Sequence, residues 1–426
     1  MKEEKIFQNT LDKLPALRLF NTFSMAIGHN KLLIAFIAVA VLGLVGFLMD
    51  MNKSVKALRL SDKIMTELDV FIENPKSVDV FIESADSNMN EGVFFTMTSL
   101  VSKKFNDMVI SLLGWDITKF FASIADLYEA FLWAFTYHPL YIGTYIIIFL
   151  AVMSFCGGAI CRIAALEISR GEKLGAIEAM RFSKEKFWSL FCAPLLPVCI
   201  VAVLGVAVLL LGLLGNIPIV GEISIGLFLP FALILGAMMT LVVVGALAGG
   251  GMKLAVIAYE VSDSFDAISR TFSYVYTKPW HLGSYHLVAL IYGGICYIFV
   301  RFFAFIILSM VYMFLWLSLW TKGAMAGTVS KLEVIWPGPE FFNLAGNHAV
   351  HAMSWSESIA AFLVNVSVAV VMGLVMAFII SFFYCSSTTI YALMRNKVDN
   401  VPISDINLNQ MQLEIPTNGT EKAGQE

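Results

Sequence analysis

The stretch LFCAPLLPVCIVAVLGVAVLLLGLL, residues 190–214, contains no Asp, Glu, Lys or Arg. About 20 consecutive apolar residues are enough to cross the hydrocarbon core of a bilayer as a helix. Further runs of this kind occur at 32–49, 140–160, 225–248, 285–320 and 359–384. The sequence therefore predicts an all-α fold, a polytopic membrane helical bundle of about six transmembrane helices with interfacial amphipathic helices.

The composition of the 426 residues supports a membrane protein. Hydrophobic residues make up 58% of the chain and charged residues only 14%, whereas a soluble domain has about 25% charged residues. This excludes a soluble enzyme, a disordered scaffold and a secreted disulfide module. The formal net charge of −4 provides no basic surface for nucleic acid, so no nucleic-acid partner is expected.

The run 285–320 is too long for an ordinary span. As one helix it would measure about 54 Å at 1.5 Å per residue, which exceeds the hydrocarbon thickness. Two spans would need a tight turn, but the segment Phe302–Phe305 contains no turn-forming residue. We therefore expect one long helix that projects beyond the membrane, with two spans as the alternative.

The distribution of basic residues predicts the orientation. Lys and Arg are frequent in 1–31, 161–189 and 253–281, and absent from the loop 215–224. The positive-inside bias assigns the basic segments to the cytoplasm. We expect a cytoplasmic leader (1–31), a retained first span (32–49), an extracytoplasmic segment (50–138), a five-span bundle (140–384) and a cytoplasmic tail (385–426), with the tail disordered beyond about Pro402.

Two segments outside the spans are expected on the outer side. In the extracytoplasmic segment, apolar residues recur at helical spacing between Val93 and Phe135, which predicts an amphipathic helix. It could lie on the outer leaflet or pack on the protein as a lid. The outer loop at 321–358 contains His348 and His351, but no third ligand is fixed by spacing, so we predict no metal. The apolar residues of the helix are Phe120, Phe121, Ile124, Leu127, Phe131, Leu132 and Phe135.

Two cytoplasmic interfacial helices are expected at 169–188 and 262–278. The first would begin at a capping box formed by Ser169 and Glu172, and each is followed by a tryptophan at the start of the next span. Such helices lie in the headgroup plane with their apolar stripe toward lipid. They could serve as structural elbows, as a gate or as a docking surface for a partner. The candidate anchoring residues are Trp188, Phe265, Ile268, Phe272 and Trp280.

The apolar runs contain few groups that could bind a ligand. Arg301 is the only charged residue within them, and an ionisable residue in a membrane segment is a functional hypothesis. It could pair with a backbone carbonyl or a loop acid, or bind an anion. Pro194, Pro197 and Gly250 could interrupt helices at a transport site, although prolines near a helix start and glycines after a helix end are ordinary. These four are the candidate ligand or lipid contacts.

The sequence contains no motif of a known catalytic site. A P-loop, GxGxxG, HExxH and GxSxG are all absent, and no acidic pair lies within a span. The hydroxyls of Ser386–Thr389 are expected to bond the preceding helical turn. We predict no enzymatic activity, no catalytic residue, no metal and no cofactor.

Four groups of motifs stand out along the chain. They are Gly157-Gly158-Ala159-Ile160-Cys161-Arg162-Ile163-Ala164, then Pro194-Leu195-Leu196-Pro197 with Gly215-Asn216-Ile217-Pro218, then YEVSDSFDAISRTFSYVY at 259–276 with Pro279-Trp280, and finally Thr389-Ile390-Tyr391-Ala392-Leu393-Met394-Arg395 with Val398-Asp399. With these motifs, 137–310 and 385–406 resemble a family of uncharacterised bacterial polytopic inner-membrane proteins. The resemblance implies a bacterial inner membrane, and it implies no activity, site residue or cofactor.

These observations favour a non-catalytic integral membrane component, such as a subunit, assembly factor or organiser of a membrane complex. The alternative is a permease for a lipid-like or small uncharged or anionic solute. The expected partners are membrane lipids and either other membrane-protein subunits or further copies of the chain. The expected location is the bacterial inner membrane, with multiple spans and both termini cytoplasmic.

Overall fold

The computed structural model describes residues 15–51, 53–60, 63–84, 90–217, 220–324, 329–346 and 353–407, and every structural statement below concerns these residues. The chain forms two compact units. Unit 1 comprises Met1–Leu19, Gly157–Tyr285 and Tyr384–Glu426, and unit 2 comprises Phe20–Cys156 and His286–Phe383. Each unit is described by itself.

The spans agree with the apolar runs of the sequence. Among the described residues, six helices are long and apolar enough to cross a membrane. They are α3 (His29–Met49), α8 (Pro139–Arg170), α10 (Phe187–Leu214), α11 (Val220–Ala248), α14 (Pro279–Ser318) and α16 (Trp355–Asp399). The chain is thus an all-α, multi-pass membrane protein, and the expected long helix over 285–320 is confirmed because α14 runs unbroken for 40 residues.

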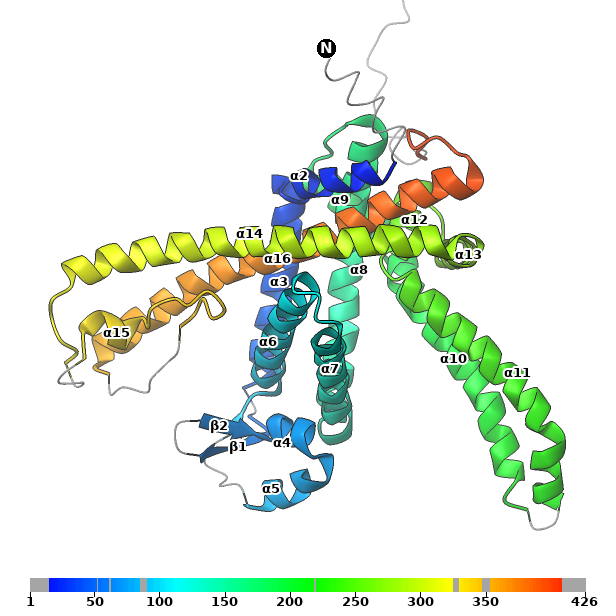
Figure 1. Cartoon of the computed structure of the whole chain (residues 1–426), viewed down its shortest axis with the longest axis horizontal. Coiled ribbons are helices and arrows are strands. Elements are labelled where there is room, and N and C mark those ends of the chain that lie inside the picture. The colour runs from blue at the N-terminus through cyan, green and yellow to red at the C-terminus, as the bar shows by residue number, and fades with distance from the viewer. Residues whose placement is uncertain are drawn as a thin grey trace, which may run out of the picture. The chain divides into compact units, whose positions relative to one another are not determined.

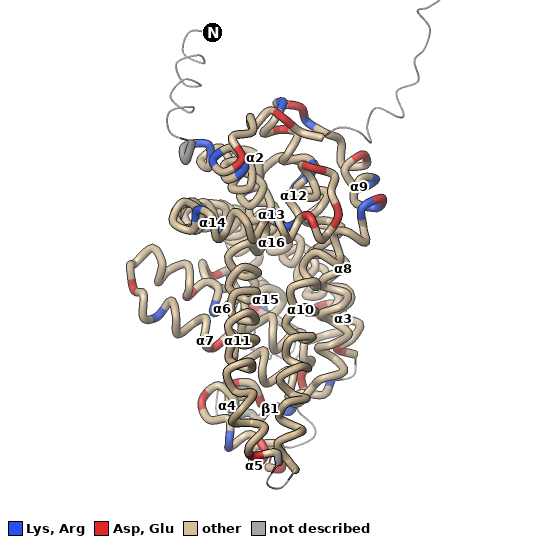
Figure 2. The backbone as a smooth tube through the Cα atoms, turned by 90° about the vertical axis from the view of Figure 1, so that its right-hand side faces the viewer, with Lys and Arg blue, Asp and Glu red and all other residues tan. Residues whose placement is uncertain are grey.

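Unit 1 combines an apolar hairpin with shorter amphipathic helices. Helices α10 and α11 lie side by side (Figure 1), and α10 also contacts α12 (Met252–Glu260) and α13 (Ser264–Thr277). Helix α9 (Ala176–Glu185) precedes α10. Figure 2 shows α10 and α11 almost free of charge, whereas the charged residues of unit 1 gather around α9 and α12. The unit therefore has an apolar part and a polar part.

Unit 2 contains a small sheet that was not predicted. Strands β1 (Val55–Leu60), β2 (Lys63–Thr66) and β3 (Asn90–Glu91) form an antiparallel sheet of order β2-β1-β3. Val55 and Ala57 alternate inward and are buried. Beside the sheet are α4 (Glu67–Glu73), the short 3-10 helix η2 (Pro75–Ser77) and α5 (Val78–Ser84). The expected extracytoplasmic segment therefore begins with mixed α and β structure.

The remainder of unit 2 is helical. Helices α6 (Val93–Leu113) and α7 (Ile117–Tyr137) form an antiparallel hairpin (Figure 1), and α7 packs on α4. The 3-10 helix η1 (Pro15–Asn21), which begins in unit 1, and α2 (Thr22–Ala26) precede α3, and α15 (Lys331–Ile335) lies in the loop 321–358. Buried residues of α14, α16 and this loop share one core, which includes Leu308, Trp336 and Val375.

The expected start of the first interfacial helix, at Ser169, is wrong. Helix α8 continues through Ser169, whose hydroxyl donates to the Ala165 carbonyl at 2.7 Å, so Ser169 does not cap a new helix. The stop comes at Gly171, whose φ of +73° suits glycine. Helix α9 begins after Gly175, whose N–H donates to the Glu178 carboxylate at 3.4 Å.

The expected C-terminal tail is also partly structured. Helix α16 extends to Asp399, and beyond it the Asn407 N–H donates to the Tyr259 carbonyl at 3.1 Å. Contacts described below hold residues 400–407 against the rest of unit 1. As expected, the hydroxyls of Thr388 and Thr389 bond carbonyls one turn earlier, at 2.7 and 2.9 Å.

Candidate functional site: a buried polar network around α12

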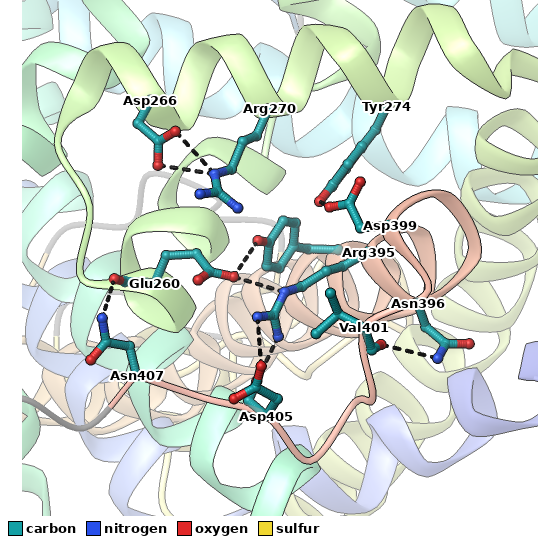
Figure 3. A network of polar contacts seen from close by, with 11 residues as sticks. Glu260, Asp266, Arg270, Tyr274, Arg395, Asn396, Asp399, Val401, Asp405 and Asn407 are labelled. Carbon is teal, nitrogen blue, oxygen red and sulfur yellow. Dashed lines mark hydrogen bonds and ion pairs between the residues drawn. The ribbon is translucent and has the colours of Figure 1, made fainter.

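A buried ion pair forms the centre of a polar network in unit 1 (Figure 3). Arg395, near the end of α16, places its Nε 2.8 Å from a carboxylate oxygen of Glu260, the last residue of α12. The two side chains are only 8% and 14% exposed. Arg395 also donates to the Asp405 carbonyl at 2.5 Å and approaches the Asp405 carboxylate at 3.5 Å. A guanidinium with several donors in a fixed plane suits this multiple contact.

Three tyrosines surround the ion pair. The Tyr391 hydroxyl donates to the Glu260 carboxylate at 3.0 Å, and its ring stacks on Tyr274 and meets Tyr259 edge-on. The Tyr274 hydroxyl donates to the Asp399 carboxylate. Burial raises the pKa of Tyr259, and burial together with the Asp399 hydrogen bond raises the pKa of Tyr274. Both therefore remain neutral phenols at physiological pH.

The network caps α12. The last four carbonyls of a helix have no partner within it, and α12 is buried along almost its whole length. The Ile257 carbonyl accepts from the Val261 N–H at 2.9 Å, with Val261 in the left-handed conformation at φ 56°. The Ala258 carbonyl accepts from Arg162 at 2.6 Å. The backbone and side-chain N–H groups of Asn407 donate to the Tyr259 and Glu260 carbonyls, each at 3.1 Å.

Arg162 joins the same cap from α8. Its side chain is 1% exposed, and it donates to the Asn407 carbonyl at 3.2 Å in addition to Ala258. Its guanidinium lies 4.9 Å from the ring centroid of Phe182 in α9, a distance typical of a cation–π contact. Segment 400–407 thus occupies the polar surface that α8, α12 and α16 provide, and the site binds a part of its own chain.

Arg301, the foremost sequence candidate, lies in unit 2 and is fully engaged by protein groups. Its three nitrogens donate to the Phe341 and Phe342 carbonyls at 2.8 and 2.7 Å and to the Tyr297 hydroxyl at 2.6 Å. Tyr297 in turn donates to Asn106 of α6 at 2.6 Å. This is the carbonyl pairing that the sequence left open beside anion binding, and Arg301 fastens the loop 321–358 to α14.

The candidate helix breakers belong to unit 1 and do not form a broken span. Pro194 and Pro197 both lie inside the continuous helix α10, and Pro197 is buried. Gly250 is exposed and lies between α11 and α12, where it ends one helix before the next begins. Each residue is therefore explained by ordinary helix structure.

The candidate anchors divide into two groups. Trp188, Phe265 and Trp280 are 73%, 66% and 88% exposed, as lipid contacts require. Ile268 is only 5% exposed, and Phe272 is half-buried beside Gly245 of α11. The expectation is therefore wrong for Ile268, because the apolar stripe of α13 packs on α10, α11 and α12 instead of facing lipid.

Sequence reasoning missed the network itself. Arg162, Glu260, Tyr391 and Arg395 all lie in the motifs that carry the family resemblance, but no role was assigned to them. His348 and His351 lie outside the described residues, and the described part of the chain contains no group of three metal-ligating side chains.

Comparison with protein-family models, with curated proteins and with solved structures gives no match for this chain. The interpretation of the network therefore rests on its own geometry. Its tyrosine hydroxyls are bonded to the Asp399 and Glu260 carboxylates, and Glu260 and Arg395 are bonded to each other and to the 400–407 segment. What this arrangement does chemically is to hold helix ends together.

Proposed function

We propose that the protein is a non-catalytic component of a membrane complex, a subunit, assembly factor or organiser, in the bacterial inner membrane with both termini cytoplasmic. The observation that carries the proposal is the exposure of the α10–α11 hairpin. Only 6% of the most apolar stretch of each helix is buried, compared with 50% in α8. Two spans with so little contact inside their own chain offer an extended surface to a partner subunit.

Two further observations favour a component over a permease. Transporter sites are commonly built from discontinuous helices near the bilayer midplane, whereas α10 and α11 continue through their prolines. Arg301, the charge best placed for an anionic solute, is bonded to three protein oxygens. In unit 1, Arg162 and Arg395 are likewise bonded to segment 400–407.

Site-specific photocrosslinking in native membranes tests the proposal. A photoreactive residue would replace Leu209 or Leu213, which are 67% and 65% exposed in α10. We expect one protein adduct of constant mass at both positions, and mixing of differently tagged copies distinguishes a homo-oligomer from a second subunit. Leu190, fully buried in the same helix, is the matched control and should give no adduct with another chain.

Two other outcomes would contradict the proposal or replace it. If both exposed positions form adducts only with lipid, the hairpin has no protein partner. If the purified protein in liposomes then also releases an entrapped anionic or uncharged solute, the permease replaces the component as the function.

A further inference from the structure

Helix α7 carries an exposed apolar stripe. Its residues alternate at spacings of four and three, which places them on one face of the helix. Each is at least 39% exposed. The stripe consists of Ile117, Phe121, Ile124, Tyr128, Phe131 and Phe135.

The first half of the opposite face of α7 is polar and points to α6, whereas Ala130 and Trp133 further along the helix are buried in an apolar core. Lys104 of α6 and Asp126 of α7 form an ion pair, and Ser111 and Ser123 are buried nearby. Together with Asp107 and Lys119, these residues line a groove of about 280 Å³ between the two helices. A helical hairpin in water buries its apolar faces and exposes its polar ones. In the first half of α7 this distribution is inverted, with apolar residues exposed and polar residues inside.

Both ends of the hairpin rest on membrane spans of the same unit. Asp50, directly after α3, accepts hydrogen bonds from the N–H groups of Phe94 and Phe95, each at 2.9 Å. The Tyr141 hydroxyl of α8 donates to the same carboxylate at 2.7 Å. At the far end, a Cβ on Gly294 of α14 would lie 3.7 to 3.9 Å from Val109, Leu112 and Leu113 of α6.

We propose that the α6–α7 hairpin is inserted in the bilayer, with the apolar stripe of α7 against lipid acyl chains. Each helix has 21 residues, or about 31 Å at 1.5 Å per residue, close to the ~30 Å of the hydrocarbon core. The hairpin enters from the side on which α3 ends and returns to it. The Lys104–Asp126 pair faces the inside of the hairpin, whereas Lys103, exposed at the middle of α6, must extend its side chain toward the headgroup layer.

The flanks of the stripe identify lipid as its contact. The 4–3 spacing would also suit a partner helix in water, but such pairs carry charged residues beside the apolar seam. The corresponding positions of α7 carry no charge. They are Thr118, Phe120, Ala125, Leu127, Leu132 and Ala134.

The test uses bimane attached to single cysteines in full-length protein reconstituted into phosphatidylcholine–phosphatidylglycerol liposomes. The background is Cys192→Ala with Cys199→Ala, which removes the two cysteines that are not buried. Phe121→Cys and Tyr128→Cys probe the stripe. Val80→Cys on α5, with 68% exposure against 62% for each stripe residue, is the matched control.

Brominated phosphatidylcholine should quench most of the emission at both stripe positions, and aqueous iodide should leave it unchanged. The control should respond to iodide and not to brominated lipid. Iodide quenching on the stripe equal to that at the control would place the hairpin in water. Protection from both quenchers would show that protein covers the stripe. Either result overturns the proposal, and an equivalent Phe131→Cys variant keeps the test decisive if one substitution prevents folding.

Discussion

Replacing Arg395 by Met should strongly destabilise unit 1. The substitution removes the ion pair with Glu260, the bond to the Asp405 carbonyl and the approach of the guanidinium to the Tyr259 ring at 5.9 Å. It leaves the Glu260 carboxylate, 14% exposed, without its arginine partner and still bonded to the Tyr391 hydroxyl. Breaking a buried pair by removing one partner costs about 3–5 kcal/mol, and we expect a loss in this range.

The chain provides a matched control for this variant. Arg270 and Asp266 form an ion pair at 3.0 Å on α13, but their side chains are 40% and 38% exposed. An exposed pair one helical turn apart contributes about 0.3–0.5 kcal/mol. Arg270→Gln should therefore change the free energy of unfolding several-fold less than Arg395→Met.

The measurement is equilibrium unfolding in mixed micelles with increasing dodecyl sulfate, followed by intrinsic tryptophan fluorescence. Adding Glu260→Gln to Arg395→Met should recover part of the loss, because no unpaired carboxylate then remains buried. If Arg395→Met costs no more than Arg270→Gln, or if the double variant equals the sum of the single losses, the ion pair does not hold the network together.

The other predictions concern single contacts. Gly157→Ala would bring a Cβ within 2.3 Å of the Tyr384 ring, and it should lower the free energy of unfolding by about 1–3 kcal/mol. In the same helix, the Cβ of Gly143→Ala meets nothing within 4 Å, so this control should cause no such loss. Equal losses for the two variants in unfolding measurements would contradict the prediction. Asp50→Ala removes the cap of α6 and should cost about 1–2 kcal/mol, with faster amide exchange in the first turn of α6; unchanged exchange would refute the cap. Burial lowers the pKa of Lys253 in the folded protein, so the stability of the wild type should rise as the pH approaches the lysine pKa of the unfolded chain, about 10.4. Lys253→Met should lack this rise in unfolding experiments at increasing pH. A parallel rise in both proteins would exclude Lys253 as its source.

The membrane helices could be predicted because lipid imposes one requirement on every residue of a span. The absence of charge in 190–214 is sufficient to predict α10, and the missing turn residues at Phe302–Phe305 are sufficient to predict one continuous α14. Helix ends were harder to predict, because outside lipid a helix stops where local chemistry stops it. Ser169 and Glu172 fit a capping pattern, but Gly171, at φ +73°, marks the actual end of α8.

The polar network could not be predicted for a different reason. Glu260 and Arg395 are distant in sequence and meet only after α12 and α16 have packed, so their spacing carries no signal of the contact. Ile268 illustrates the same problem on α13. Its place on an apolar stripe is compatible with lipid or with protein, and only the packing of α10, α11 and α12 against α13 decides between them.

The buried charges of unit 1 lie where the last carbonyls of α12 need hydrogen-bond donors. This helix has nine residues and is too buried for water to reach its last carbonyls, so the protein must supply donors. Arg162 and Asn407 supply three of them and the Val261 N–H the fourth. A buried cation such as Arg162 is costly in an apolar protein unless it makes several bonds, and free helix carbonyls are suitable acceptors for it. The carbonyls of α12 and the segment 400–407 therefore stabilise each other, which explains why this segment packs on unit 1 after the last span.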